Sequence, residues 1–359
     1  MTDILAIFGT RPEAIKLGPV AHELLVASVD IKAICTGQHT SLLAGSPAET
    51  TFADAVSLGM ASDGNVTGWT ARIREKLTLA IRDVAPEIVI VQGDTMSAVV
   101  GASVAYDLEI PIGHIEAGVR SHDDGDPWPE ERNRKRIAEL ATWHYAPTTT
   151  AMANLMAESV PEARIRVTGN TVVSALARYA PDTRFVPQPE NVILVTLHRR
   201  ELHKRDLLNN LYGTIRLQAL SHPHLTFVWP VHPAIEKLLD RLHEPPNLKL
   251  RAPMAYTAFT QRLAHSKGLL TDSGGAVEEA ATLGVPTVIL RATNDRPEAV
   301  EAGIAIRADV SPEGIISGVQ WLTDPQTMRL PTSAFGDETA ADQVATHLAW
   351  TAMRMKVRA

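Results

Sequence analysis

The chain has 359 residues, which is too long for one comfortable hydrophobic core and suits two α/β domains. Apolar residues make up 45% of it and charged residues 21%, the balance of a globular protein rather than a disordered one. The formal net charge of −7 does not favour binding to nucleic acid. An anionic ligand would therefore have to be held by local positive groups.

The first candidate strand, Ile4–Phe8, runs straight into a charged segment, which does not resemble a signal peptide. No apolar run approaches the roughly 18 residues that a membrane span needs. Cys35 is the only cysteine and lies in an apolar run, so no intrachain disulfide can form. We therefore expect a cytoplasmic protein without a membrane or nucleic-acid partner.

Short apolar runs alternate with segments of helical period along the chain, which predicts α/β units with parallel sheets. The runs are mostly β-branched, as in strands covered on both faces. The predicted strands are Ile4–Phe8, Ile31–Thr36, Ile88–Gln92, Ile112–Ile115, Val192–Thr196, Thr226–Val231, Gly268–Thr271 and Thr287–Leu290. The predicted helices include Ala14–Ala27, Trp69–Val84, Met96–Asp107, Arg132–Ala141 and Ala276–Leu283.

A proline-rich stretch without periodicity, Tyr179–Asn191, reads as a linker between two domains. We predict a first Rossmann-like domain over residues 1–178 and a second over 191–337. Residues 338–359 are expected to form a C-terminal helix.

The first turn that could bind a ligand is Gly9-Thr10-Arg11-Pro12-Glu13, directly after a strand. Gly permits a sharp turn, Pro suits the first helical turn, and a helix N-terminus offers N–H groups to an anion. Arg11 could add a bidentate phosphate contact. An ordinary β-to-α turn with a surface arginine explains the segment equally well.

Carboxylates follow the next strands. Asp94 comes after Ile88–Gln92, Glu116 after Ile112–Ile115, and Glu130 near the start of a helix behind Pro-Trp-Pro. Asp94 could simply cap a helix, and acids in a first turn are often only dipole partners. Three carboxylates near one sheet edge, with Arg120 and Arg134 nearby, nevertheless favour acid–base chemistry, because like charges sharing a site separate their pKa values.

Two turns of the second half could hold phosphate. His198 and Arg199 follow Val192–Thr196, although a solvated basic turn would be the ordinary reading of that segment alone. Ser273-Gly274-Gly275 opens a helix that carries Glu279, an arrangement that can cradle a diphosphate and bond a ribose hydroxyl. No cluster has zinc-ligand spacing, so we predict no metal, and we predict no cofactor.

Together these segments resemble the bacterial non-hydrolysing UDP-N-acetylglucosamine 2-epimerases. The resemblance covers nearly the whole chain in ten ordered blocks: FGTRPEAIK (8–16), TGQH (36–39), QGDT (92–95), HIEAGVRS (114–121), PWPEERNR (127–134), TGNTV (168–172), LHRRE (197–201), PVHP (230–233), TDSGGAVEEA (271–280) and RPEAVEAG (296–303).

The resemblance implies a glycosyltransferase-B-like pair of Rossmann-like domains with the active site in the cleft between them, a C-terminal helix that packs back on the first domain, and a homodimer. It also implies interconversion of UDP-GlcNAc and UDP-ManNAc by elimination and re-addition of UDP through a 2-acetamidoglucal. Such a path needs cations on the departing diphosphate and carboxylates around the sugar.

Residue by residue, the resemblance gives two sets. The implied catalytic residues are Asp94, Glu116, Glu130, Arg134 and His198. The implied substrate-binding residues are Arg11, Lys16, Arg120, Arg199, His232, Ser273, Gly274, Gly275, Glu279 and Arg296.

This chain departs from the family pattern in three places. Leu197 stands where the family has Gly, and Arg291–Arg296 reads RATNDR instead of an acidic-threonine run. Thr40 and Ser41 replace residues of a second UDP-GlcNAc site that many members use for allosteric activation. We therefore expect the enzyme to turn over without a lag and without an activator. An assay started from UDP-ManNAc alone that shows no reaction until UDP-GlcNAc is added would contradict this expectation.

Three other interpretations stay open. A hydrolysing epimerase would release UDP and N-acetylmannosamine, but it usually carries Gly-Gly-Glu where this chain has Glu116-Ala117-Gly118. A UDP-sugar glycosyltransferase of the same fold would need an acceptor site, which no segment advertises. A sensor without activity would not need every matched acid and base position filled.

Overall fold

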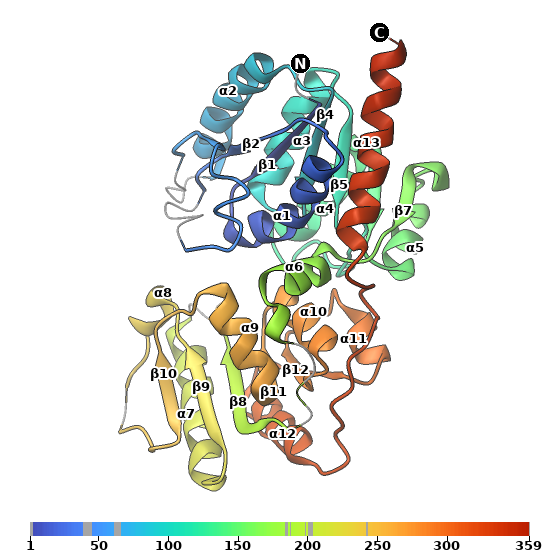
Figure 1. The fold of residues 1–359 in the computed structure, drawn as a ribbon. Coiled ribbons are helices and arrows are strands. Elements are labelled where there is room, and N and C mark those ends of the chain that lie inside the picture. The colour runs from blue at the N-terminus through green and yellow to red at the C-terminus, as the bar shows by residue number, and fades with distance from the viewer. Residues whose placement is uncertain are drawn as a thin grey trace. The chain divides into compact units, whose positions relative to one another are not determined.

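The computed structural model describes residues 3–38, 45–60, 66–183, 186, 188–197, 199, 204–241 and 243–358. The chain forms two compact units: residues 1–179 together with 335–359, and residues 180–334. Each unit is built on one sheet of parallel strands with helices between them, so the predicted fold class is confirmed (Figure 1).

The sheet of the first unit has the order β3-β2-β1-β4-β5-β6-β7 and is parallel throughout. The chain turns from one side of β1 to the other between β2 and β4, and ligands of open α/β sheets bind at such a switch point. The strands are β1 (Ile4–Phe8), β2 (Ile31–Cys35), β3 (Val56–Ser57), β4 (Ile88–Gln92), β5 (Ile112–Ile115), β6 (Trp143–Ala146) and β7 (Ile165–Val167).

Helices connect these strands and bury both faces of the central ones, which is why β1, β4 and β5 are apolar along their whole length. The helices of the first unit are α1 (Arg11–Val26), α2 (Val66–Val84), α3 (Met96–Asp107), α4 (Glu130–Leu140), α5 (Thr149–Ala157), α6 (Thr171–Tyr179) and α13 (Ala340–Arg358), with a 3₁₀ turn at Glu162–Arg164.

The C-terminal helix α13 belongs to the core of the first unit. Its residues Val344 and Leu348 are fully buried and pack with Leu17 of α1 and Tyr145 of β6 in one hydrophobic cluster. The hydroxyl of Tyr145 and Nδ1 of His347 lie 2.9 Å apart. The first unit is therefore made of two stretches of chain that are separated by the whole of the second.

The second unit has the sheet order β10-β9-β8-β11-β12-β13, again parallel. Its strands are β8 (Glu190–Thr196), β9 (Thr226–Pro230), β10 (Leu248–Arg251), β11 (Ser266–Thr271), β12 (Thr287–Leu290) and β13 (Ala305–Ala308). Its helices are α7 (Arg205–Ser221), α8 (Pro233–Glu236), α9 (Tyr256–His265), α10 (Gly274–Leu283), α11 (Pro297–Glu301) and α12 (Pro312–Thr323), with a 3₁₀ turn at Pro181–Thr183.

All eight predicted strands form, and those that the sequence pattern did not predict are mostly at sheet edges. β3, β7, β10 and β13 are the outermost strands of the two sheets. Edge strands need less apolar surface, so a strand such as β10, with the sequence LKLR, lacks the continuous apolar run that marks a central one.

Candidate functional site

The carboxyl ends of β4 and β5 bring Asp94 and Glu116 to one edge of the first sheet. Gln92 pairs with Ile115 in the parallel register, and the Gly93 amide donates to the Ile115 carbonyl at 3.0 Å. The two predicted catalytic carboxylates therefore follow adjacent strands at their carboxyl ends, where α/β sheets hold their ligands.

Arg134 holds the Asp94 carboxylate from the neighbouring helix α4. Its Nε donates to Asp94 Oδ2 at 2.8 Å and its Nη2 lies 2.7 Å from the same oxygen. The side-chain amide of Asn133 donates to the Asp94 carbonyl at 2.7 Å, so α4 fixes both ends of this residue. Glu130 is the first residue of α4, one helical turn before Arg134 and on the same face of the helix.

Glu116 adopts a left-handed backbone conformation, with φ of 66°, which is unusual for a residue with a side chain. Its carboxylate forms a buried ion pair with Lys16 of α1 and accepts a hydrogen bond of 2.7 Å from Gln92 Nε2. Backbone of this kind persists only where surrounding contacts hold it in place, and it is found most often at functional sites.

Glu13 occupies the beginning of α1. Its Oε2 accepts hydrogen bonds from the amides of Gly9 at 3.0 Å and Thr10 at 2.7 Å. Two of the amides that the sequence offers to an anion are therefore bound by the chain itself. Arg11, which is half-buried at the start of α1, provides the positive charge of this turn.

His114 lies in β5 beneath the same edge and is fully buried. Its Nε2 is 2.8 Å from the Gly93 carbonyl, which can only accept, so Nε2 carries the proton. Burial lowers the pKa of His114 to about 4. His144, its partner in the register with β6, is buried as well, and burial lowers its pKa to about 3. Both imidazoles are neutral at physiological pH.

Two further predicted residues, Arg120 and Arg199, make hydrogen bonds within the protein. Arg120 donates from Nε and Nη2 to Glu158, at 2.7 and 2.6 Å, and from Nη1 to the Val119 carbonyl at 2.8 Å, which favours a structural role. His198, Thr40 and Ser41 lie outside the described residues. The Arg199 amide donates to Asp272 Oδ2 at 2.9 Å.

A second group of predicted residues gathers at the N-terminus of α10. Ser273 caps this helix by accepting from the Ala276 amide, and Gly274 and Gly275 form its first turn. A Cβ placed on Gly274 would lie 3.6 Å from Cζ of Arg296, so this guanidinium stands beside the helix N-terminus. Positive charge next to a helix N-terminus suits an anion such as a diphosphate.

Arg296 is held by buried acids. It forms ion pairs with Glu278 of α10 and with Asp295, and Asp295 pairs in turn with Arg291. All four side chains are more than nine-tenths buried. Glu279 is also buried, next to Glu278 in α10, and His232 is exposed ahead of α8.

Sequence reasoning did not assign site roles to Glu13, Gln92, Glu278 and Arg291, although all four contact predicted site residues or their turns. Glu13 and Gln92 stand inside the motifs GTRPE and QGDT, so their position next to assigned residues was the available signal. Glu278 likewise stands directly before the assigned Glu279, and Arg291 opens the stretch that ends at the assigned Arg296. Their contact with each other's surroundings carries no sequence signal, because only folding brings the end of β12 and the second turn of α10 together.

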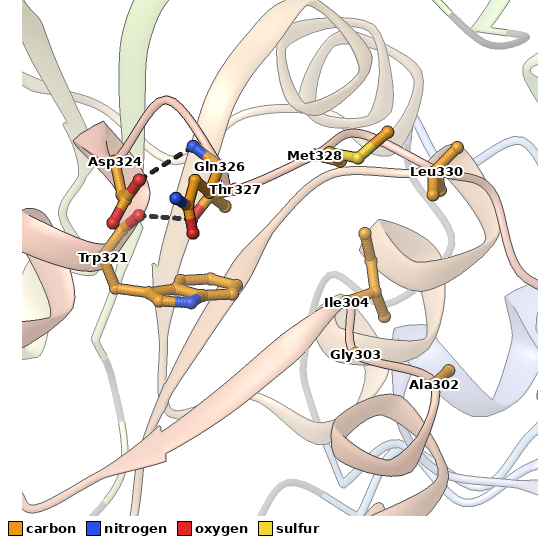
Figure 2. A pocket seen from close by; sticks show the side chains of 9 residues that line it. All are labelled: Ala302, Gly303, Ile304, Trp321, Asp324, Gln326, Thr327, Met328 and Leu330. Carbon is orange, nitrogen blue, oxygen red and sulfur yellow. Dashed lines mark hydrogen bonds between the residues drawn. The ribbon is translucent and has the colours of Figure 1, made fainter.

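Two pockets lie at the amino ends of the strands, at the side of each sheet away from the candidate site residues. Figure 2 shows one of about 430 Å³ in the second unit, lined by Ile304 ahead of β13 and by Trp321, Met328 and Leu330. Another, of about 690 Å³, lies in the first unit ahead of β5 and β6. Both are at the amino ends of the strands, and neither is lined by a predicted site residue. Among the described residues, no group of three His, Cys, Asp or Glu side chains could hold a metal ion.

Each unit is a Rossmann-like domain with acidic and basic side chains at the carboxyl ends of its strands, and the solved structures that match the chain have the glycosyltransferase-B-like fold. The family model for UDP-N-acetylglucosamine 2-epimerase matches residues 24–349, and the chain belongs to this family.

Similar proteins cover nearly all of the chain. The UDP-N-acetylglucosamine 2-epimerase of Neisseria meningitidis serogroup A is 37% identical over 84% of this chain and 85% of its own. That of Escherichia coli O157:H7 is 34% identical over 95% of this chain and 96% of its own. A crystal structure of UDP-GlcNAc 2-epimerase from Neisseria meningitidis bound to UDP-GlcNAc matches with a TM-score of 0.85 and 33% identity, over 97% of this chain and 99% of that one.

Proposed function

We propose that this protein interconverts UDP-GlcNAc and UDP-ManNAc without a nicotinamide cofactor. The observation that carries the proposal is the group of side chains at the carboxyl ends of β4 and β5. Asp94 is held by Arg134, and Glu116 is held by Lys16 and Gln92. This arrangement places acidic and basic groups together in a member of the epimerase family.

The proposed reaction breaks the C1–O bond of the sugar and removes the C2 proton. The electron pair of C1–O leaves with UDP, the proton goes to a base, and a C1–C2 double bond remains in the sugar. UDP then re-adds to C1 after a proton returns to C2 from the other face. Carboxylates at the sugar suit the proton steps and the positive charge that develops in the ring.

In this proposal, Asp94, Glu116 and Glu130 act at the sugar, and Arg134 and Lys16 hold two of these carboxylates. Ser273, Gly274, Gly275 and Arg296 bind the diphosphate, and Glu279 binds the ribose. A cytoplasmic location and a homodimer also remain predictions, the latter tested by light scattering for twice the protomer mass of 38.9 kDa. No helix in the described ranges is long and apolar enough to cross a membrane.

The deciding experiment is proton NMR of the purified protein with UDP-GlcNAc in heavy water. We expect deuterium to enter C2 and a manno signal to appear while the amount of nucleotide sugar stays constant. Steady accumulation of free UDP would instead indicate the hydrolysing reaction, and no exchange at C2 would contradict epimerisation.

A pair of variants assigns the activity to this edge of the sheet. Glu116→Gln should slow turnover by orders of magnitude, because an amide cannot take up or deliver the proton. Glu139→Gln is the matched control, since Glu139 is an exposed residue of α4 that pairs only with Arg136 in the described contacts. Near-normal turnover of the Glu116 variant would remove that residue from the mechanism.

A further inference from the structure

One carboxylate near the proposed site has no role in the chemistry above, although it touches two of the turns that form the site. The Glu13 side chain is 1% exposed and accepts three hydrogen bonds. Two come from the Gly9 and Thr10 amides of the β1–α1 turn. The third comes from the Thr95 hydroxyl of the β4–α3 turn, with 2.7 Å between Thr95 Oγ1 and Glu13 Oε1.

The direction of the Thr95 bond is determined by the helix that follows. Thr95 is the N-cap of α3, and its Oγ1 accepts a hydrogen bond from the Ala98 amide at 3.1 Å. The hydroxyl proton is then available for Glu13. Three donors thus converge on the two oxygens of one buried side chain. Both oxygens of a carboxyl group can accept a hydrogen bond, whereas an amide has a donor nitrogen in place of one of them.

The two turns that Glu13 joins carry residues of the proposed site. Arg11 follows Thr10 directly, and Asp94 precedes Thr95 directly. Lys16, which pairs with Glu116, lies one turn further along α1. A shift of the first turn of α1 would therefore move Arg11 directly, Asp94 through Thr95, and Glu116 through Lys16.

The β1–α1 turn leaves no room for a side chain at Gly9. A Cβ on Gly9 would lie 1.8 Å from Ser97 Oγ and 2.5 Å from Thr36 Oγ1, so only glycine fits there. The Glu13 side chain bonds to both turns and so connects them.

We propose that Glu13 is a positioning residue, whose carboxylate joins the turn that carries Arg11 to the turn that carries Asp94 and holds both in the geometry that turnover requires. This inference rests on the proposed epimerase function. It assigns to Glu13 no proton transfer and no contact with the substrate.

The test compares Glu13→Gln with Thr95→Val, which removes the same bond from its other end, and with Thr95→Ser, which keeps the hydroxyl. Glu23→Gln is the control, because Glu23 lies on the same helix away from this edge. Turnover of UDP-GlcNAc, UDP affinity by calorimetry, thermal melting and amide hydrogen exchange are measured for each variant.

We expect kcat to fall about 10- to 100-fold in Glu13→Gln and Thr95→Val, the effect of a small misplacement of reacting groups. UDP affinity should fall less than kcat does, since the diphosphate contacts proposed at Ser273, Gly274, Gly275 and Arg296 are in the second unit and only Arg11 is in the turn that Glu13 holds. Thr95→Ser and Glu23→Gln should keep near wild-type turnover. The double variant Glu13→Gln/Thr95→Val should be no slower than the slower single variant, because both remove one connection.

Hydrogen exchange separates this inference from the proposed function. Glu13→Gln should speed exchange both at residues 9–10 and at residues 94–98. Faster exchange in the first segment alone, additive losses in the double variant, or kcat within twofold of wild type in folded Glu13→Gln would each overturn the inference. If Glu13→Gln does not fold, equal kcat for Thr95→Val and Thr95→Ser overturns it. A wild-type protein without C2 exchange overturns the epimerase function instead, whatever the variants show.

Discussion

Lys16 of α1 forms a buried ion pair with Glu116, which directly follows β5.

 The pair connects the first helix to the carboxyl end of β5, and Gln92 of β4 donates to the same carboxylate at 2.7 Å. Since Glu116 has a left-handed backbone, these contacts hold in place a conformation that costs free energy.

Removing the lysine should therefore destabilise the protein. Lys16→Met leaves the buried Glu116 carboxylate without its cation, and we expect a loss of about 3 kcal/mol in the free energy of unfolding. Urea denaturation measures this loss. The double variant Lys16→Met/Glu116→Gln should recover part of it, because neither charge of this pair is then left buried without the other. A Lys16→Met variant as stable as wild type would contradict a stabilising pair.

The Glu13 carboxyl should make stability depend on pH. Burial raises its pKa from 4.5 to about 7, so the folded state keeps a proton that the unfolded state releases. The stabilisation is fully present below pH 4.5 and is lost as the pH rises through about 7. Relative to Glu13→Gln, the wild type should lose about 3 kcal/mol of unfolding free energy between pH 4 and pH 8. A pH-independent difference between the two proteins would contradict the raised pKa.

The buried His114 should make the free energy of unfolding depend on pH below about 6.5. The pKa of His114 is lowered to about 4, so its contribution is present above pH 6.5 and is lost as the pH falls towards 4. His114→Gln, whose amide can still donate to the Gly93 carbonyl, should remove about 3 kcal/mol of this acid sensitivity. Unfolding curves of wild type and variant between pH 7 and pH 4 measure it. If the unfolding free energies of the two proteins change with pH in the same way, the pKa of His114 does not differ between the folded and unfolded states.

The proposed diphosphate site can be tested at Gly274. An added Cβ would meet Arg296 only at 3.6 Å, an ordinary contact, so Gly274→Ala should fold normally. The methyl group would stand at the N-terminus of α10, and we expect UDP affinity to fall roughly tenfold, a loss of about 1.4 kcal/mol. Calorimetry with UDP measures this change.

Gly213→Ala in α7 is the control, because a Cβ there meets nothing within 4 Å and the residue lies inside a helix. It should raise stability by up to about 1 kcal/mol and leave UDP binding unchanged. Equal UDP affinity in Gly274→Ala and wild type would remove the α10 N-terminus from the proposed diphosphate site.

The central strands and the turns behind them could be predicted from the sequence, because a fully buried parallel strand has a continuous apolar run. Asp94 and Glu116 could be placed at one sheet edge for the same reason, since each directly follows such a strand. The sequence could not show that the Gly9 and Thr10 amides bind Glu13, because the phosphate-binding turn and the self-capped turn have the same residue pattern.

Contacts between distant segments were also beyond sequence reasoning. The alternation of charges in RATNDR does not show that Asp295 pairs with both Arg291 and Arg296, or that Glu278 of α10 joins them. Arg120 is a further example. Its position in HIEAGVRS predicts a ligand contact, and nothing in that motif indicates that its three guanidinium nitrogens donate to Glu158 and to a backbone carbonyl.

The place of α13 in the first unit has a consequence for the order in which the protein can fold. The ribosome delivers residues 180–334 as one continuous stretch, so the second unit can fold as soon as it emerges. The first unit begins earlier but lacks Val344 and Leu348 until the end of the chain arrives. The half that is synthesised first is therefore the half whose core is completed last, and until then its apolar surface under α13 is open to chaperones.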